Sequence, residues 1–269
     1  MRASTGPPAA TGPAASREPG CLGGKVALVT GGGTGIGRGV AVAFAREGAR
    51  VALMGRRPEP LAATASEIRA FGADCLEIKG DVAREADVAS VIAEIERAWE
   101  RLDVVVNNAA CYEPRPALDT ELESWDRTLA VNLRGPYLMA RAAFPALARS
   151  HGSVINVSST IGLRPVPGAA AYCVSKAALD MLTRVLAVEW AGSRVRVNSI
   201  LLGIVDTPLH QTRAIEDQAA WRASADRMHP LGRMGTPADA AEAAVYLASD
   251  RAAWTTGALL VVDGGISLV

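Results

Sequence analysis

The chain is poor in aromatic residues and has no excess of charge of either sign. Aromatic residues make up 4% of its 269 residues, and 28 Lys and Arg balance 28 Asp and Glu, with a sequence pI of about 6.8. Proteins that bind nucleic acids are typically basic and often stack the bases on aromatic side chains. The composition therefore argues against a nucleic acid as the main ligand.

Cysteine and histidine are scarce and scattered. The four cysteines form no CxxC pair, and the three histidines are far apart in the chain. Zinc sites usually need closely spaced ligands, and disulfides persist in oxidising compartments. The sequence therefore predicts no metal site and a reducing compartment, the cytoplasm. The residues concerned are Cys21, Cys75, Cys111, Cys173, His151, His210 and His229.

Long apolar runs are also missing. No stretch approaches the roughly 18 uncharged apolar residues of a membrane span, so no membrane partner is predicted. The first 20 residues contain four prolines among Ala, Gly, Ser and Thr, without the continuous apolar segment of a secretory signal. We expect residues 1–22 to form a disordered tail; a weak transit peptide is the alternative.

The rest of the chain alternates between short apolar runs and longer amphipathic stretches. Such near-continuous runs of Val, Ile and Leu are typical of strands buried on both faces of a parallel sheet. The stretches 35–47 and 88–99 have apolar residues at helical spacing between these runs. The pattern predicts a single α/β domain over residues 23–269, a doubly wound, Rossmann-type sheet of seven parallel strands with helices on both faces. The runs are 26–30, 51–54, 75–79, 103–107, 153–158, 195–201 and 258–262.

One segment interrupts this alternation. Residues 206–235 follow the sixth run and look helical, but they precede the next regular helix and contain His210, Trp221, Met228 and His229. Long excursions after a strand's carboxyl end often cover the ligand in open α/β folds. We expect a lid here; an additional surface helix is the alternative.

A glycine-rich turn, TGGGTGIG, follows the first run. Glycines allow the backbone to turn tightly and to approach a ligand without a Cβ in the way. A helix that begins near Gly35 directs its free amides and its positive dipole end at the turn, which suits a pyrophosphate. The spacing is T-G-x-x-x-G-x-G, with Gly31, Gly35 and Gly37 at the fixed positions. The turn between a strand and a helix therefore predicts a dinucleotide site.

The end of the second run indicates which dinucleotide is bound. An NAD site usually has a carboxylate here to hold the ribose hydroxyls. This chain has Gly55 followed by Arg56 and Arg57, and a guanidinium matches a 2′-phosphate. The sequence therefore favours NADP(H) over NAD(H), unless both arginines are simply solvated.

Tyr172 and Lys176 are four residues apart at the start of a stretch with helical periodicity. This spacing puts both side chains on one face, one turn apart. An ammonium about 4 Å away could lower the phenol pKa by up to roughly three units before the cost of burying the lysine is subtracted. We therefore expect Tyr172 to be a general acid and base near neutral pH, close to Ser158 and Ser159 at the end of the fifth run.

Taken together, these motifs resemble those of the short-chain dehydrogenase/reductase family, in its short single-domain branch, over residues 25–269. The resemblance implies a proton donor at Tyr172, a lysine at Lys176 that also holds the nicotinamide ribose, and a carbonyl-polarising serine at Ser159. It also implies that Asn132 helps to hold a proton-relay water. The matching stretches are TGGGTGIG (30–37), GDV (80–82), NNAA (107–110), VNL around Asn132, INVSS (155–159), YCVSK (172–176), RVNSILLGIVDTP (196–208) and PLGRMGTP (230–237).

The turn, the arginine and the resemblance together give a set of expected cofactor contacts. Three of the residues singled out by the resemblance have an alternative role. Asp81 and Thr207 could cap helices, and Asn132 could cap or kink its own helix. Two positions depart from the family pattern, Ala110 in place of glycine and Leu202 in place of proline, and both concern cofactor affinity rather than the reaction. The expected contacts are Gly31, Thr34, Gly35, Ile36, Gly37, Arg56, Asp81, Val82, Asn107, Tyr172, Lys176, Val205 and Thr207.

The sequence thus predicts an NADP(H)-dependent oxidoreductase that interconverts a carbonyl and a secondary alcohol. An NAD(H)-dependent alcohol dehydrogenase of the same family and a non-catalytic dinucleotide sensor are the alternatives. The expected substrate is a moderately hydrophobic ketone or alcohol. By resemblance, the chain is expected to be a homo-oligomer, a tetramer or dimer. The candidate pocket residues include Tyr112, Glu113, Arg164, Val166, Pro167, Leu201, Leu202, His210, Trp221 and Met228.

Overall fold

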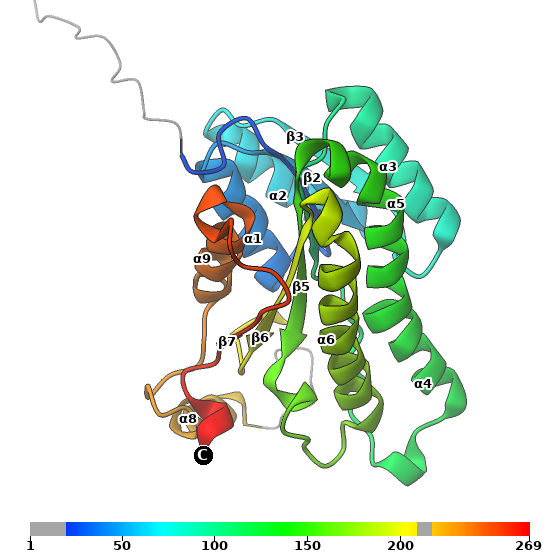
Figure 1. The fold of residues 1–269 in the computed structure, drawn as a ribbon. Helices are drawn as coiled ribbons and strands as arrows, with labels where there is room; N and C mark the ends of the chain where they lie inside the picture. The colour runs from blue at the N-terminus through cyan, green and yellow to red at the C-terminus, as the bar shows by residue number, and fades with distance from the viewer. Residues whose placement is uncertain (1–19, 209–216) are drawn as a thin grey trace, which may run out of the picture.

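Every apolar run predicted to be a strand forms one. The computed structural model describes residues 20–208 and 217–269, and its strands form one parallel sheet in the order β3-β2-β1-β4-β5-β6-β7 (Figure 1). The bounds differ from the predicted ones by at most one residue. They are β1 Val26–Thr30, β2 Arg50–Gly55, β3 Cys75–Lys79, β4 Val104–Asn107, β5 Ser153–Ser159, β6 Arg196–Leu202 and β7 Leu259–Val262.

The direction of winding reverses between β1 and β4. The first three strands build outward from β1 on one side, and the chain then returns to place β4 on the other side of β1. In open α/β sheets a ligand binds beyond the carboxyl ends of the strands at such a switch point. The fold therefore directs attention to the loops after β1 and β4.

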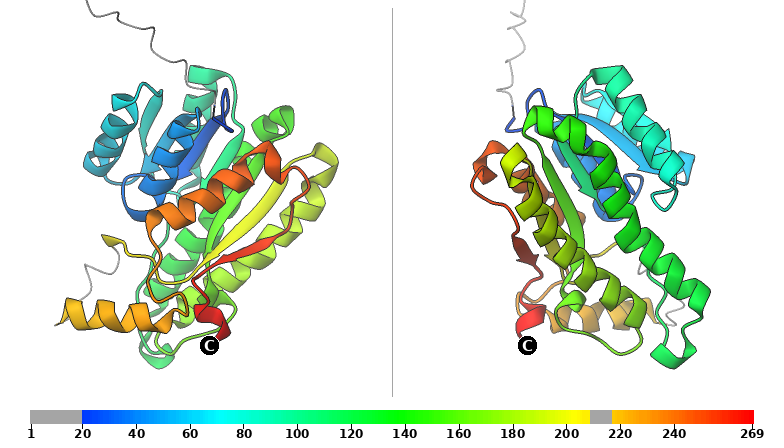
Figure 2. Two further views of the ribbon diagram at one scale, coloured as in Figure 1. Left: turned by 90° about the vertical axis from the view of Figure 1, so that its left-hand side faces the viewer. Right: turned by 45° about the vertical axis from the view of Figure 1, so that its right-hand side comes forward.

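Helices cover both faces of the sheet, as predicted. Helices α1, α2 and α9 pack on one face, and α3, α5 and α6 pack on the other (Figures 1 and 2). Two further α-helices of the described residues extend from this framework: α4 leads into α5, and α8 follows β6. The bounds are α1 Gly35–Arg46, α2 Pro58–Ala70, α3 Glu85–Trp99, α4 Leu122–Leu129, α5 Gly135–Ser150, α6 Ala170–Trp190, α8 Gln218–Met228 and α9 Pro237–Ala248.

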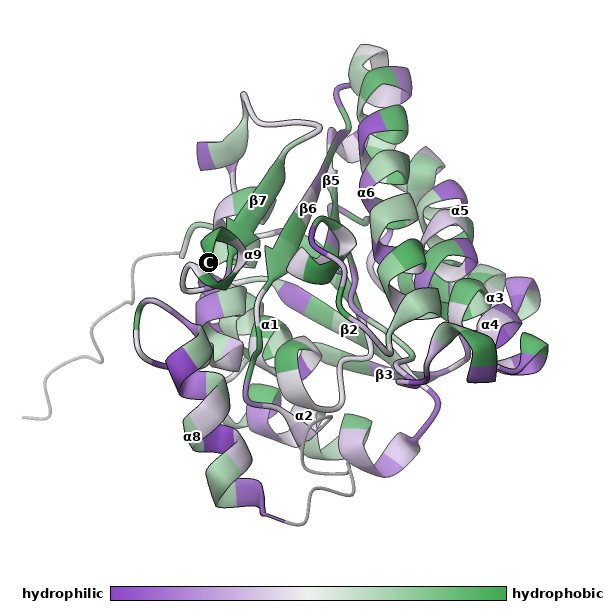
Figure 3. Ribbon diagram, turned by 90° about the horizontal axis from the view of Figure 1, so that it is seen from below, coloured by the Kyte–Doolittle hydropathy of each residue, from purple (hydrophilic) through white to green (hydrophobic). Residues whose placement is uncertain are grey.

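The alternation of side chains along each strand divides the core into two parts. In β1, Ala27 and Val29 contact the cluster under α1, α2 and α9, whereas Val26 and Leu28 contact the cluster under α3, α5 and α6. Because both faces are covered, the strands consist almost entirely of apolar residues, and they are mostly green in Figure 3. Hydrophilic residues gather on helices such as α8 in the same view.

Packed structure begins slightly earlier than expected. The predicted tail, residues 1–22, lies largely outside the described residues, but Leu22 is completely buried and its N–H donates to Glu47 O at 3.0 Å. Leu22, which lies inside the predicted tail, is thus packed against the domain. Within the described residues, no helix has the length and apolar character needed to cross a membrane.

Candidate active site

A cavity of about 1010 Å³ lies along the carboxyl ends of the strands. It runs from the turn after β1 past the ends of β2 and β3 to the region between β5, β6 and α6. All of the expected cofactor contacts line it except Gly37 and Asn107. Residues that are distant in the sequence therefore meet at one edge of the sheet, as the switch point predicts.

The turn after β1 leaves the first amides of α1 open toward the cavity. Gly31 and Gly35 have φ values of 66° and 53°, a left-handed conformation that suits glycine. Thr34 precedes the helix but makes no side-chain cap, and it lines the cavity together with Gly31, Gly35 and Ile36. Free amides at a helix N-terminus bind anions, so this end of the cavity fits a pyrophosphate.

Gly37 differs from Gly31 and Gly35 in its surroundings. It does not line the cavity, and a Cβ built on it would overlap the carbonyl oxygen of Gly31 and lie 2.8 Å from the carbonyl carbon. Glycine at this position lets α1 pack directly against the turn. Gly37 therefore fixes the position of the turn relative to α1.

The end of the cavity near β2 and β3 carries the groups expected for the adenosine half of a dinucleotide. Arg56 and Arg57 are exposed at the rim, and neither makes an ion pair with a residue that the structure describes. Asp81 and Val82 follow β3 and also line the cavity. Asp81 caps no helix, since α3 begins at Glu85; its carboxylate instead accepts a hydrogen bond from Ala83 N at 3.0 Å.

The structure does not bring Asn107 to the cavity. Its side chain is buried and donates to Asn156 Oδ1 at 2.9 Å, which ties the end of β4 to β5. The next residue, Asn108, lines the cavity instead, and its amide donates to Thr30 O at 2.9 Å. Sequence reasoning missed Asn108 because the NNAA motif has two adjacent asparagines and does not reveal which side chain faces the cavity.

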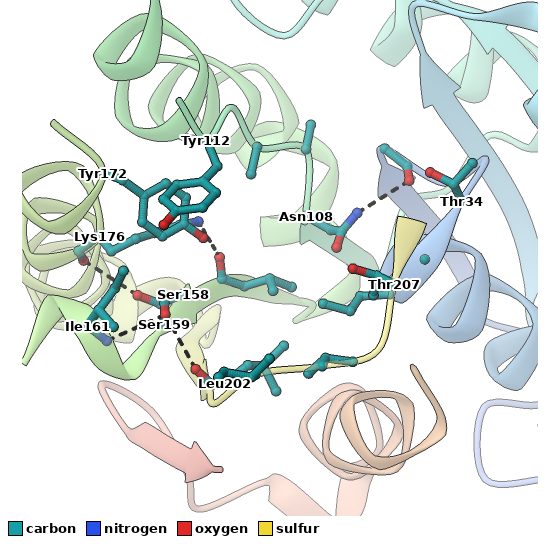
Figure 4. Close-up of a pocket in the computed structure, with 18 of the residues that line it drawn as sticks. Thr34, Asn108, Tyr112, Ser158, Ser159, Ile161, Tyr172, Lys176, Leu202 and Thr207 are labelled. Atoms are coloured by element: carbon teal, nitrogen blue, oxygen red, sulfur yellow. Dashed lines mark hydrogen bonds between the residues drawn. The ribbon is translucent and has the colours of Figure 1, made fainter. Parts of the chain in front are cut away.

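Tyr172 and Lys176 point toward one another from the first turns of α6, as the spacing predicts (Figure 4). The Lys176 ammonium lies 5.4 Å from the centroid of the Tyr172 ring and donates to Val157 O at 2.8 Å. The ring of Tyr112 contacts that of Tyr172 edge-on, with the centroids 4.8 Å apart. All three side chains line the cavity.

The predicted acidification of Tyr172 is wrong for the protein on its own. Burial, with a smaller contribution from Tyr112, raises the pKa of Tyr172 above its ordinary value. Burial also lowers the pKa of Lys176 to about 8, and the negative charge of Asp180 partly opposes this change. At neutral pH the structure therefore presents a protonated phenol next to an ammonium, which is the arrangement of a proton donor.

The two serines at the end of β5 differ in their surroundings. Ser158 is buried and donates to Lys176 O at 3.5 Å. Ser159 is half-buried, and its hydroxyl makes two long hydrogen bonds of 3.4 Å: it donates to Leu202 O and accepts from Ile161 N (Figure 4). Both serines line the cavity, and Ser159 is the more accessible of the two.

Asn132 occupies a π-helical segment, Ala130–Arg134, between α4 and α5. The side chain is fully buried and outside the cavity lining, and it donates to Cys111 O at 2.9 Å and Ser175 Oγ at 3.1 Å. Its Oδ1 accepts a hydrogen bond from Cys111 N at 2.7 Å. Asn132 therefore links the loop after β4 to α6 across a π-helical turn.

The opposite end of the cavity is mostly apolar. Glu113 is not part of the lining, because it pairs with Arg127 and accepts from Ser124 Oγ, which hold its pKa well below the ordinary value. Pro167 and Leu201 are also absent from the lining, and His210 lies outside the described residues. The lining at this end includes Tyr112, Ile161, Arg164, Val166, Leu202, Ile204, Trp221, Arg227, Met228 and Ile266.

Helix α8 supplies part of this wall and is fixed at its C-terminal end. His229 is buried, with Nδ1 2.7 Å from Ala225 O and Nε2 3.3 Å from Ile204 N. A proton on Nδ1 satisfies both contacts, because that nitrogen then donates and Nε2 accepts. His229 thus joins the helix to the loop after β6.

Comparison with known proteins matches this architecture to a family. The family model described as enoyl-(acyl carrier protein) reductase matches residues 31–267, which include the glycine turn, Ser159, Tyr172 and Lys176. The chain belongs to the short-chain dehydrogenase/reductase family.

Several relatives of this short-chain dehydrogenase/reductase are dehydrogenases. It is 38% identical over 248 residues to 2,5-dichloro-2,5-cyclohexadiene-1,4-diol dehydrogenase LinX of Sphingobium indicum, covering 92% of this chain and 98% of that protein. It is 36% identical to 2-(S)-hydroxypropyl-CoM dehydrogenase 3 of Xanthobacter autotrophicus, covering 91% and 97%. A solved short-chain type dehydrogenase/reductase from Mycobacterium marinum superimposes with a TM-score of 0.84 at 35% identity, covering 91% and 96%. The chain is therefore an NAD(P)-dependent oxidoreductase.

The two departures from the family pattern leave the cavity of this short-chain dehydrogenase/reductase intact. Ala110 and Leu202 both line it, and neither replaces a group that could react. Gly203, directly after Leu202, packs closely against the end of β7: a Cβ there would lie 2.9 Å from Asp263 O. The loop after β6 is thus constrained by packing rather than by a proline ring.

Proposed function

We propose that the protein transfers a hydride between NADP(H) and a carbonyl carbon or secondary alcohol, with Tyr172 as the general acid and base. The observation that carries this proposal is the single cavity: open helix amides at one end and the Ser159, Tyr172 and Lys176 side chains at the other. The nicotinamide, when bound, supplies or accepts the hydride. The residues of this chain bind the reactants and move the proton.

In the reductive direction the Tyr172 hydroxyl donates its proton to the carbonyl oxygen. Ser159 donates a second hydrogen bond to the same oxygen, since its present bond to Leu202 O is long, at 3.4 Å, and easily exchanged, while Ile161 N can continue to donate to its hydroxyl. The Lys176 ammonium stabilises the phenolate that Tyr172 becomes. In the oxidative direction Tyr172 must first lose its proton, which its raised pKa opposes, so oxidation requires a higher pH.

The preference for NADP(H) rests on the rim near β2. Arg56 is exposed, lines the cavity and has no ion-pair partner among residues 20–208 and 217–269. Gly55 stands where a carboxylate would hold the ribose hydroxyls of NAD. A guanidinium that is available for a bidentate contact suits a 2′-phosphate.

The apolar end of the cavity supports a moderately hydrophobic ketone or alcohol as substrate. Trp221 and Met228 lie in α8 and form part of this wall, so we propose that the described part of the predicted lid, residues 217–235, covers the substrate. Residues 209–216 of the predicted lid lie outside the described residues. Asn132 lies outside the cavity but contacts the loop that carries Tyr112, and we retain it as the residue that holds a relay water.

We also propose that the protein is a homo-oligomer. Helices α5 and α6 lie side by side on the outer surface (Figure 2), and α6 exposes an apolar stripe at helical spacing. The stripe consists of Val174, Met181, Val185 and Val188. The four cysteines are free, which favours the cytoplasm as the compartment.

Turnover of a panel of ketones and secondary alcohols with NADPH and with NADH tests the proposal. We expect NADPH-dependent reduction of at least one apolar ketone. Tight NADPH binding without turnover across the panel would instead favour a non-catalytic dinucleotide sensor.

A further inference from the structure

Helix α6 carries a third ionisable residue in line with its reactive pair. Tyr172, Lys176 and Asp180 are spaced by four residues, so their side chains follow one another along one face of the helix. This face packs against β5 and β6. The mechanism above uses the first two residues and leaves Asp180 without a role.

Asp180 is an unusual group to find at this depth. It is 4% exposed, and its Oδ1 accepts a hydrogen bond from Ser199 Oγ at 3.0 Å. Its Oδ2 is buried and has no hydrogen-bond partner in the part of the chain that the structure describes. A buried carboxylate is costly unless a charge or several hydrogen bonds compensate for it. Burial raises the pKa of Asp180 above its ordinary value, and the hydroxyls of Ser158 and Ser199 together with a nearby cation act in the opposite direction.

Lys176, one turn earlier, has the complementary requirement. It is 2% exposed, and its ammonium has three N–H donors but makes one hydrogen bond, to Val157 O, among the described residues. Burial alone would favour loss of its proton. The negative charge of Asp180 acts in the opposite direction.

Few other charges reach Asp180. On α6 itself, Lys176 and the exposed Arg184 are the cations that act on it. From the sheet, β5 contributes the hydroxyl of Ser158 and β6 that of Ser199, neither of which is charged. The charge of Arg184 is screened by water, so Lys176 is the main cation that acts on Asp180. It acts through space, because within the described residues the Lys176 ammonium is bonded to Val157 O and forms no ion pair with Asp180.

We propose that Asp180 is a buried counter-ion that keeps Lys176 in its ammonium form. It is a positioning residue: it contacts neither the substrate nor the cofactor, and it acts on the reaction through Lys176. Its consequence for turnover rests on the proposed function, whereas its effect on the charge of Lys176 does not.

The lysine content of the chain allows a direct measurement. The sequence contains three lysines, Lys25, Lys79 and Lys176, so ¹³Cε-labelled lysine gives three NMR titration curves, and Lys176→Met identifies one of them. In the wild type we expect the Lys176 curve to have a midpoint at about 8. Asp180→Asn keeps the shape of the side chain and removes its charge, and should lower this midpoint by about one unit.

Glu189→Gln is the matched control, because it removes the same charge from an exposed position on the same helix. It should leave the Lys176 midpoint unchanged. An unchanged midpoint in Asp180→Asn would overturn the proposal. An equal shift in both variants would also overturn it, since a general change in helix charge would then suffice.

Activity provides a second readout. The pH profile of kcat/KM for NADPH reports ionisations of the free enzyme. In Asp180→Asn the alkaline limb of this profile should shift to lower pH by as much as the Lys176 midpoint does. The shift would lower kcat/KM about fivefold at pH 8 and much less at pH 6. A uniform loss at every pH would indicate a merely structural role. Absence of wild-type turnover would contradict the proposed function but leave the NMR result valid.

If Asp180→Asn does not fold, the double variant Lys176→Met/Asp180→Asn decides the matter. A counter-ion pair predicts that removing both charges restores folding, because neither charge is then left buried alone. If the double variant also fails to fold, Asp180 is required for packing, and the proposal is refuted.

Discussion

Gly37→Ala tests whether the close approach of α1 to the turn is what shapes the phosphate site. The new Cβ would lie 2.8 Å from the Gly31 carbonyl carbon, whereas ordinary contacts begin at 3.4 Å. Gly31 cannot easily retreat, because it has a left-handed φ and its N–H is bonded to Met54 O at 2.8 Å. The helix or the turn must therefore shift by more than half an ångström. Overpacking of this kind costs about 1–3 kcal/mol.

This strain has two measurable consequences. A loss of about 1–3 kcal/mol lowers the Tm of a domain of this size by about 2–12 °C. Displacement of the amides should also weaken NADPH binding by about tenfold or more, measured by fluorescence titration. Gly192→Ala is the control, since a Cβ there meets nothing within 4 Å and φ is not positive. Wild-type affinity for NADPH in Gly37→Ala would refute the reasoning.

Three further predictions concern cofactor choice, pH and assembly. Arg56→Ala should lower kcat/KM for NADPH by about 10–100-fold, because one charge-assisted contact is lost, and should leave kcat/KM for NADH nearly unchanged. A wild-type preference for NADH would contradict the assignment. Because the pKa of Lys176 is lowered to about 8 and that of Tyr172 is raised, kcat/KM for carbonyl reduction should be flat below about pH 7 and fall above pH 8. A fall that begins only near pH 10 would argue against a role for the buried ammonium. Val188→Glu introduces a charge into the apolar stripe of α6 and should reduce the mass measured by light scattering relative to Glu189→Gln, whereas a monomeric wild type would contradict the proposed interface.

The sheet was predictable because its strands are short apolar runs separated by amphipathic helices. Burial on both faces leaves this pattern directly in the sequence, and all seven strands lie where the runs predict. The cavity edge followed from the same information, since the carboxyl ends of parallel strands face one side. The positions of Ser159, Tyr172 and Lys176 around the cavity therefore needed little more than the strand and helix assignments.

What the sequence does not reveal is which way a side chain points and how deeply it is buried. Asn107 and Asn108 look alike in the motif, but the first is bonded inside the sheet and the second lines the cavity. Gly37 serves packing rather than ligand contact, which depends on the separation of two backbone segments. The direction of the Tyr172 pKa was mispredicted for the same reason, because the pKa is raised by burial, which the sequence does not reveal. The π-helical turn at Asn132 has no local sequence pattern.

The most direct test of the account is Tyr172→Phe, which removes one hydroxyl and keeps the ring that contacts Tyr112. NADPH titration and steady-state turnover should be measured on the same preparation. The account predicts NADPH affinity close to that of the wild type and a loss of turnover of at least about 100-fold, since a general acid contributes about 10²–10⁴-fold. Turnover near the wild-type rate would contradict the assignment of Tyr172 as the proton donor.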